Sequence, residues 1–280
     1  MKARIALGSV LTAYWLSLGA SHLTAQQLVG FGESPSYDIV VPAFTDREVT
    51  RLVTTLDARL STEQDPAKWE SDATTLRDFT RRLQAGRLSS TQEARVLQHL
   101  GELSRTHPAE AALLEKSRYL VSALTVGKAA PEITGKDLDG VDLRLSDYRG
   151  KVVLLVFSGD WCGICRSEYP YERLLLELYK NWPFAIVGVD SDGDRDAAKK
   201  AGVEHGLTYR SWWDGGGANS DSEDGPIASA WGVVGWPTVY LLDAQGVIRF
   251  VDLRQENLLK GVHQLLTEQA QHNLKPNSGR

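Results

Sequence analysis

Cysteine is scarce in this chain. Only two of the 280 residues are cysteines, Cys162 and Cys165, and they stand three positions apart. A disulfide between them would close a very small loop, and the stability that a disulfide adds grows with the length of the loop it closes. A purely structural bridge is therefore a poor explanation, and we expect this pair to carry chemistry.

Metal ligands are also few and scattered. A tetrahedral zinc site needs four ligands, and there is no third cysteine. The six histidines show no ligand spacing: His22, His99, His107, His205, His263 and His272. Arg166 follows the second cysteine, where a c-type haem attachment sequence has histidine. The sequence therefore favours thiol chemistry without a metal or a bound cofactor, apart from a redox-active disulfide between Cys162 and Cys165.

Basic residues are fewer than acidic residues in this chain. The chain has 31 Lys and Arg against 36 Asp and Glu, a net charge of −5. No basic stretch is interleaved with aromatic residues, so nucleic acid is excluded as a partner. A hydrophobic content of 42% and a charged content of 24% are typical of a soluble globular protein. The length suffices for one large or two modest domains.

A long apolar run occurs at the start of the chain. Lys2 and Arg4 precede an uncharged, largely apolar stretch over 5–20, and the small residues Ala20, Ser21 and Ala25 offer cleavage points. This pattern predicts a signal peptide over 1–25 and export to the periplasm or another extracytoplasmic compartment. The run is shorter than the roughly 20 residues of a membrane-spanning helix. An uncleaved N-terminal anchor is the alternative.

Residues 26–126 are predicted to form a helical domain with an extended lead-in over 26–44. Apolar residues recur at helical spacing from 45 to about 124, which indicates about four helices packed as hairpins. Two pairs have the spacing of a capping box, in which two side chains satisfy free amides at a helix start: Thr45 with Glu48, and Ser90 with Glu93. Two prolines are expected at helix starts, in Asp65-Pro66 and His107-Pro108.

The pattern changes near Gly127 and predicts an α/β domain over 127–270. The expected strands are 152–157, 184–189, 238–242 and 247–251, and the expected helices are 163–180, 195–205 and 255–269. Turn signals stand at 138–141 and 243–246. This order predicts a sheet of mixed direction flanked by helices. We expect a polar loop over 214–226 and a disordered tail over 271–280.

The segment Trp161-Cys162-Gly163-Ile164-Cys165 follows a buried strand and opens a helix. Free amides and the helix dipole at such a position lower the pKa of a thiol. The spacing brings both sulfurs to one side of the first turn. Cys162, the earlier and more exposed residue, is expected to attack a disulfide, and Cys165 to resolve the resulting mixed disulfide.

From about residue 127 to residue 269 the chain resembles the thioredoxin-like TlpA/ResA family of exported thiol–disulfide oxidoreductases. The resemblance spans roughly half the chain and rests on Ala130-Pro131-Glu132, Leu145 to Val153, Trp161 to Cys165, Gly235-Trp236-Pro237-Thr238 and Leu242 to Gly246. It implies a thioredoxin-like fold and disulfide exchange with protein or small-thiol partners. It also implies a thiol electron donor or acceptor linked to the membrane.

The resemblance implies further site residues. Pro237 would be a cis-proline facing the sulfurs, and Trp161 and Trp236 would help to bind substrate; Trp236 shielding the disulfide is the alternative. Glu168 would accept the proton that Cys165 loses, and a solvated surface position is its alternative. Asp160 is expected near the mouth of the site, where its charge opposes thiolate formation.

Two other functions stay open at this point. A peroxiredoxin-like thiol peroxidase shares the fold, but Leu155 and Gly159 occupy the places of its usual proline and hydroxyl residue. Alternatively, the helical half is the functional part, as a binding or scaffolding module with an accessory redox domain. The sequence does not fix whether the protein reduces or oxidises its partners.

Overall fold

The structure is a computed structural model that describes residues 39–60, 69–215, 225–233 and 235–274. The predicted signal peptide over 1–25, most of the lead-in and Asp65-Pro66 lie outside the described residues. Residues 38–280 belong to one compact unit. The domain boundary near residue 126 therefore stays a prediction.

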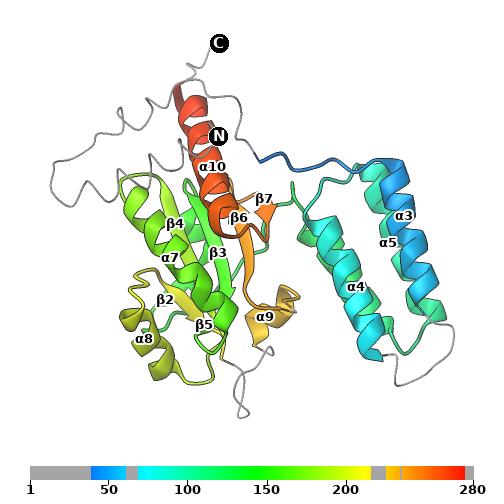
Figure 1. Ribbon diagram of the computed structural model, residues 1–280, viewed down its shortest axis with the longest axis horizontal. Coiled ribbons are helices and arrows are strands. Elements are labelled where there is room, and N and C mark those ends of the chain that lie inside the picture. Colours follow the sequence, from blue (N-terminus) through cyan, green and yellow to red (C-terminus); the bar gives the residue numbers. More distant parts are fainter. Residues whose placement is uncertain (1–38, 61–68, 216–224, 234, 275–280) are drawn as a thin grey trace, which may run out of the picture. The chain divides into compact units, whose positions relative to one another are not determined.

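Within the part of the chain that the structure describes, four helices precede the sheet, in agreement with the predicted number (Figure 1). They are α3 (Asp46–Arg59), α4 (Trp69–Gln84), α5 (Ser90–Thr106) and α6 (Ala111–Ala123). Their apolar faces form one buried cluster, since the residues recur at helical spacing and point the same way. That cluster includes Val49, Leu56, Leu76, Phe79, Leu83, Val96, Leu100 and Leu114.

The capping predictions for these helices are confirmed in part. Thr45 and Glu48 form the expected capping box at α3. The second box is formed by Ser89 with Gln92, so the prediction of Ser90 with Glu93 is wrong by one residue. The extended backbone of Ser89 turns its hydroxyl toward the Gln92 amide at 3.2 Å, whereas Ser90 is already helical. Pro108 lies in the turn before α6 and not at its first residue, which also corrects the prediction.

The central sheet has five strands in the order β5-β4-β3-β6-β7. They are β3 (Val152–Ser158), β4 (Phe184–Asp190), β5 (Ser211–Trp213), β6 (Thr238–Leu242) and β7 (Ile248–Val251). The β3–β4 and β4–β5 pairs are parallel, and the β3–β6 and β6–β7 pairs are antiparallel. The predicted mixed direction is confirmed. A separate hairpin joins β1 (Thr134–Lys136) to β2 (Asp142–Arg144) through the predicted turn.

Both faces of the sheet are covered, so β3 is buried along its whole length, as its unbroken apolar sequence predicts. α7 (Gly163–Leu178) and α10 (Gln255–Leu274) lie side by side on one face (Figure 1) and share a core cluster with alternate β3 residues. The other face holds Phe157, Trp212, Trp231 and Tyr240, packed with Leu120 and Leu124 from the end of α6. The remaining elements are η3 (Leu145–Tyr148), α8 (Arg195–Glu204) and α9 (Pro226–Ala230).

Two loop predictions need correction. α9 begins at Pro226, within the predicted polar loop, because the Asp214 carboxylate accepts hydrogen bonds from the Ile227 and Ala228 amides at 2.8 and 2.6 Å. α10 continues to Leu274, so the predicted disordered tail is wrong for residues 271–274. The helix extends past its last buried turn into exposed residues. Residues 216–224 and 275–280 lie outside the described part.

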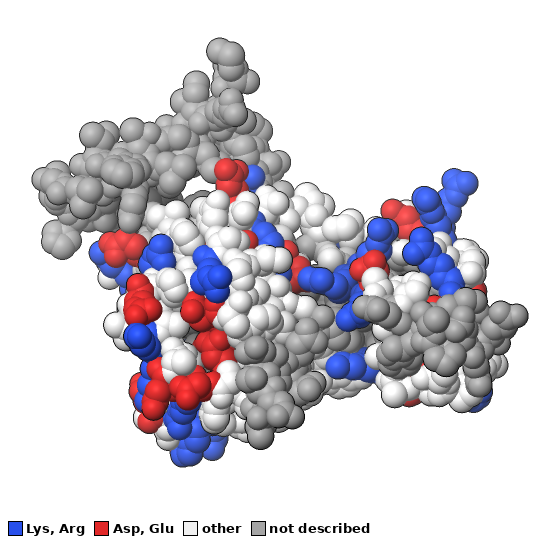
Figure 2. All heavy atoms as spheres, turned by 60° about the horizontal axis from the view of Figure 1, so that its bottom comes forward, with Lys and Arg blue, Asp and Glu red and all other residues white. Residues whose placement is uncertain are grey.

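Two further observations concern the distribution of surface charge and the possibility of membrane-spanning helices. On the face that Figure 2 shows, Lys and Arg side chains are interspersed with Asp and Glu and form no continuous basic patch. Within the described residues, none of the helices combines the length and the apolar composition needed to cross a membrane.

Candidate active site

The two cysteines sit where β3 passes into α7. Cys162 is the N-cap residue of α7, and its sulfur accepts a hydrogen bond from the Cys165 amide at 3.2 Å. Both thiols are free. Cys162 retains 7% of its surface and Cys165 only 1%. The predicted helix-start position and the predicted order of exposure are therefore confirmed.

The loop before Cys162 is held by the end of β4. Because β3 and β4 run parallel, their carboxyl ends lie at the same edge of the sheet. The Asp192 carboxylate accepts hydrogen bonds from the amides of Asp160 at 2.9 Å and Trp161 at 3.4 Å. The Trp161 indole donates to the Ser191 hydroxyl at 3.1 Å. These contacts fix the approach to the attacking sulfur, and sequence reasoning did not find Asp192 or Ser191.

Two tryptophans meet beside the first cysteine. The Trp236–Pro237 peptide bond is cis, as the resemblance implies. The rings of Trp161 and Trp236 lie edge to face, with centroids 6.1 Å apart. Trp161 keeps 40% of its surface exposed. The structure thus brings the loop of Pro237 up to the residue that precedes Cys162, although the substrate-binding roles of these three residues stay predictions.

Burial shapes the chemistry of the second cysteine. It raises the pKa of Cys165, and the hydrogen bond with Cys162 and the charges of Cys162 and Glu172 raise it further. Cys165 therefore holds its proton in the resting dithiol. Its attack on a mixed disulfide requires a group that takes this proton.

Glu168 is buried, so its alternative interpretation as a solvated surface residue is wrong. Its Oε2 atom accepts a hydrogen bond from the Gln255 amide at 3.0 Å, at the first residue of α10. The carboxylate therefore joins α7 to α10. Its role as proton acceptor for Cys165 stays a prediction.

A second buried glutamate, Glu172, lies one turn further along α7. Burial raises its pKa to about 7, although a hydrogen bond from the Tyr209 hydroxyl at 2.8 Å opposes that shift. Its charge acts on Cys165. Sequence reasoning missed Glu172, but helical spacing gives the signal, because seven residues from Cys165 amount to about two turns on the same face.

Further acids lie around the loop before Cys162. Burial and the charge of Asp192 raise the pKa of Asp190 to about 7, and burial also raises the pKa of Asp192. The Oδ1 atom of Asp160 lies 3.1 Å from His205 Nε2, so one of the histidines without ligand spacing contacts this loop. Three acidic residues, Asp160, Asp190 and Asp192, therefore lie at or beside the loop that precedes Cys162.

In the ranges that the structure describes, no three His, Cys, Asp or Glu side chains are arranged to hold a metal ion. The redox-active disulfide between Cys162 and Cys165 stays a prediction, since both thiols are free.

Comparison with known proteins gives consistent results. Residues 126–251 match the AhpC/TSA family. The thiol–disulfide oxidoreductase ResA of Geobacillus thermodenitrificans is 34% identical over 128 residues, which cover 46% of this chain and 69% of that protein. The thioredoxin-like protein YneN of Bacillus subtilis is 32% identical over 126 residues, covering 44% and 68%.

Among solved structures, the thioredoxin domain of a thiol–disulfide oxidoreductase from Bacteroides vulgatus is 31% identical, with a TM-score of 0.45; the match covers 51% of this chain and 99% of that one. The curated relatives are named for thiol–disulfide exchange or for likeness to thioredoxin. This chain therefore belongs to the ResA-type thiol–disulfide oxidoreductases, and its residues 126–251 carry the match to the AhpC/TSA family.

Proposed function

We propose that this oxidoreductase is exported and exchanges disulfides with partner proteins or small thiols through a mixed disulfide on Cys162. The observation that carries the proposal is the asymmetry of the pair: Cys162 caps α7 and keeps some exposure, whereas Cys165 is buried behind it. An amide donor on the Cys162 sulfur stabilises the charge of an attacking thiolate.

Bonds, electrons and protons are conserved in the exchange. The Cys162 thiolate attacks one sulfur of a partner disulfide; that bond breaks, a Cys162–partner bond forms, and the second partner sulfur leaves as a thiolate. Cys165 then loses its proton and attacks the Cys162 sulfur, which releases the first partner sulfur. The partner gains two electrons and two protons, and the Cys162–Cys165 pair becomes a disulfide. Each step is reversible, so the same residues serve oxidation of a dithiol.

Two carboxylates are candidates to take the Cys165 proton. The pKa of Glu172, raised to about 7, lets it accept a proton when ionised and return it near neutral pH. Glu168 is the alternative that the family resemblance implies, and it is engaged with the Gln255 amide. We assign the role to Glu172, because it is buried on the face of α7 that carries Cys165, about two turns further along the helix.

Partner recognition is assigned to the surface around Cys162. The exposed side chains of Trp161 and Ile164 flank it. Backbone beside Pro237 can pair with an extended substrate segment as an added strand. Export is supported by the N-terminal sequence over 1–25. In this proposal a membrane-linked thiol donor or acceptor recharges the cysteine pair, and a measured equilibrium potential of the couple decides the direction.

The experiment is a trapping assay. A Cys165→Ser variant cannot resolve the mixed disulfide, so partners should accumulate on Cys162 and be released by a reductant. A Cys162→Ser/Cys165→Ser variant is the matched control and should trap nothing. Absence of adducts from the single variant, or equal adducts from the control, would contradict the proposal.

The peroxidase alternative is not favoured, because the curated relatives reported above are named for thiol–disulfide exchange and thioredoxin likeness. Leu155 and Gly159 also stand at the positions of the usual peroxide-pocket residues. Selective, fast turnover of peroxide by Cys162 would reverse this choice.

A further inference from the structure

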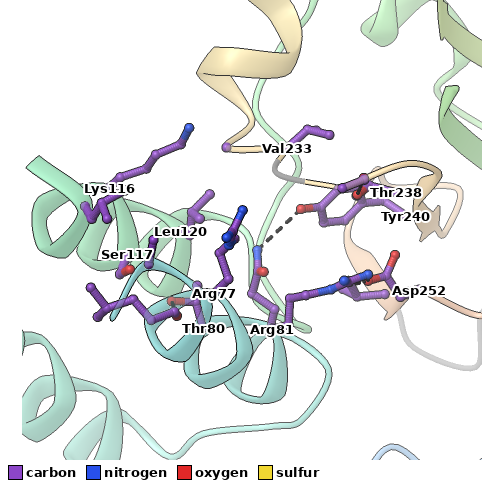
Figure 3. Close-up of a pocket in the computed structure, with 17 residues that line it drawn as sticks. Arg77, Thr80, Arg81, Lys116, Ser117, Leu120, Val233, Thr238, Tyr240 and Asp252 are labelled. Carbon is purple, nitrogen blue, oxygen red and sulfur yellow. Dashed lines mark hydrogen bonds and ion pairs between the residues drawn. The ribbon is translucent and has the colours of Figure 1, made fainter. Parts of the chain in front are cut away.

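A groove runs between the helical region and the segment that leads into Pro237 (Figure 3). One wall is formed by α4 and α6, and the other by Gly232, Val233, Gly235, two residues of β6 and the end of β7. Its apolar lining includes Leu76, Leu113, Leu120, Val233 and Val251. Buried hydroxyl-bearing residues, Thr80 and Ser117, contribute from the helices. The proposed redox chemistry does not use this groove.

The charged residues of the groove are mainly basic. Arg77, Arg81 and Lys116 line it from the helices, and Asp252 is the one acid among its lining residues. Figure 3 shows Arg81 directed toward Asp252, and the two groups pair at 2.6 Å. Asp252 also pairs with Arg254 at 3.1 Å, so its charge is already shared. An excess of positive charge is left in the groove, on a chain whose net charge is −5.

The other two cations are available. The recorded contact of the Arg77 guanidinium is with the Thr74 hydroxyl at 3.2 Å. Lys116 has no ion pair within the described part of the chain. Both side chains are half-buried beside apolar groups, where an ion pair is screened less than on an open surface. Arginine also matches a carboxylate in a bidentate geometry.

The groove is connected to the active site through two adjacent residues. A side-chain carbon placed on Gly235 would lie 3.9 Å from Arg81 Nη1. Trp236 follows Gly235, and its ring packs on Trp161, which precedes Cys162. A polypeptide whose cysteine reacts at Cys162 therefore brings its neighbouring residues toward the groove.

We propose that this groove binds acidic side chains that flank the reacting cysteine of a partner polypeptide, with Arg77 and Lys116 as specificity residues. The apolar walls accommodate the methylene groups of glutamate, and the two cations pair with its carboxylate. This inference rests on the proposed exchange at Cys162 and names the partners that the site prefers. It also gives the helical region a part in substrate selection.

The test uses the full-length reduced protein and synthetic cysteine peptides that carry a coloured aromatic thiol as the leaving group. Matched peptides place two Glu or two Gln either before or after the cysteine. The second-order rate constant should be about tenfold higher for one Glu peptide than for its Gln counterpart, and 0.5 M salt should remove most of the difference. The favoured side of the cysteine reports the direction in which the peptide lies.

An Arg77→Gln/Lys116→Gln variant should lose this preference, so that its rate constants for the Glu and Gln peptides become equal. Lys180→Gln/Lys260→Gln removes two cations elsewhere and should keep the preference. Equal rates for Glu and Gln peptides in the unmodified protein, or equal loss in both variants, would overturn the groove assignment alone. Failure to react with every peptide would overturn the proposed exchange itself.

Discussion

The Tyr209 hydroxyl donates a hydrogen bond to Glu172 Oε2 at 2.8 Å, and both residues are largely removed from solvent. Tyr209 stands just before β5, and Glu172 lies on α7. The contact therefore fixes a buried carboxylate behind the cysteine pair. Burial raises the pKa of Glu172 to about 7, which allows it to change charge near neutral pH.

The first prediction concerns the resolving step. In the native protein the rate at which Cys165 clears a mixed disulfide should rise through about pH 7, because ionised Glu172 takes the Cys165 proton. Glu172→Gln should lose this inflection, since glutamine does not titrate. Acid-quenched decay of the mixed disulfide between pH 5 and 9 measures the rate. Glu168→Gln should keep the inflection of the rate near pH 7. If the inflection disappears in the Glu168→Gln variant, Glu168 is the proton acceptor instead of Glu172.

The second prediction concerns stability. The unfolded chain ionises residue 172 near its ordinary pKa of 4.5, whereas the folded chain ionises it near 7. The unfolded state therefore binds fewer protons between these values, and stability falls as pH rises through this range. Glu172→Gln should remove this loss, and its free energy of unfolding should gain about 2 kcal/mol relative to the native protein between pH 5 and pH 8.

Urea unfolding of both reduced proteins at the two pH values checks this expectation. Glu177→Gln is the matched control, because Glu177 lies on the same helix but is exposed. An equal response of both variants to pH would show that Glu172 does not titrate between 4.5 and 7.

Local signals predicted the part of the site that one short segment forms. The strand, the tight turn and the helix start around Cys162 follow from an apolar run and a three-residue spacing, which need no distant partner. The capping box at α5 marks the limit of such reasoning. Ser89 and Ser90 each have a suitable partner three residues on, and spacing alone does not choose between them.

Residues that act through tertiary contacts were missed for a different reason. Asp192 reaches the loop of Trp161 because parallel pairing places the two strand ends together, and no sequence spacing encodes that distance. Arg77 lines the groove near Gly235 because the helices pack against the sheet region. The sequence therefore predicted the cysteine motif in the first turn of α7. It did not predict the tertiary hydrogen bonds that position this motif.

The third prediction tests that network. Asp192→Asn keeps an oxygen that can accept from the Asp160 and Trp161 amides, whereas Asp192→Ala removes it. Both variants lose the same charge, so the difference between them reports the hydrogen bonds. The Ala variant should be less stable than the Asn variant by about 1–3 kcal/mol in urea unfolding, and slower in the attack of Cys162 on a disulfide. Identical stability and rate would mean that Asp192 does not hold the loop.

The fourth prediction tests how the helical region packs against the redox region. Gly232 has φ +63°, and a side-chain carbon there would overlap Leu120 of α6. Gly150 has φ +89°, and nothing lies within 4 Å of such a carbon. Alanine at either position carries the strain of a left-handed backbone, but only Gly232→Ala also requires the buried Leu120 side chain to move. Gly232→Ala should therefore lower the free energy of unfolding by about 1–3 kcal/mol more than Gly150→Ala does.

If the groove between these regions selects acidic partners, Gly232→Ala should also weaken the preference for Glu peptides, while Gly150→Ala leaves it intact. Equal stability of the two variants would show that α6 does not press on residue 232 in solution.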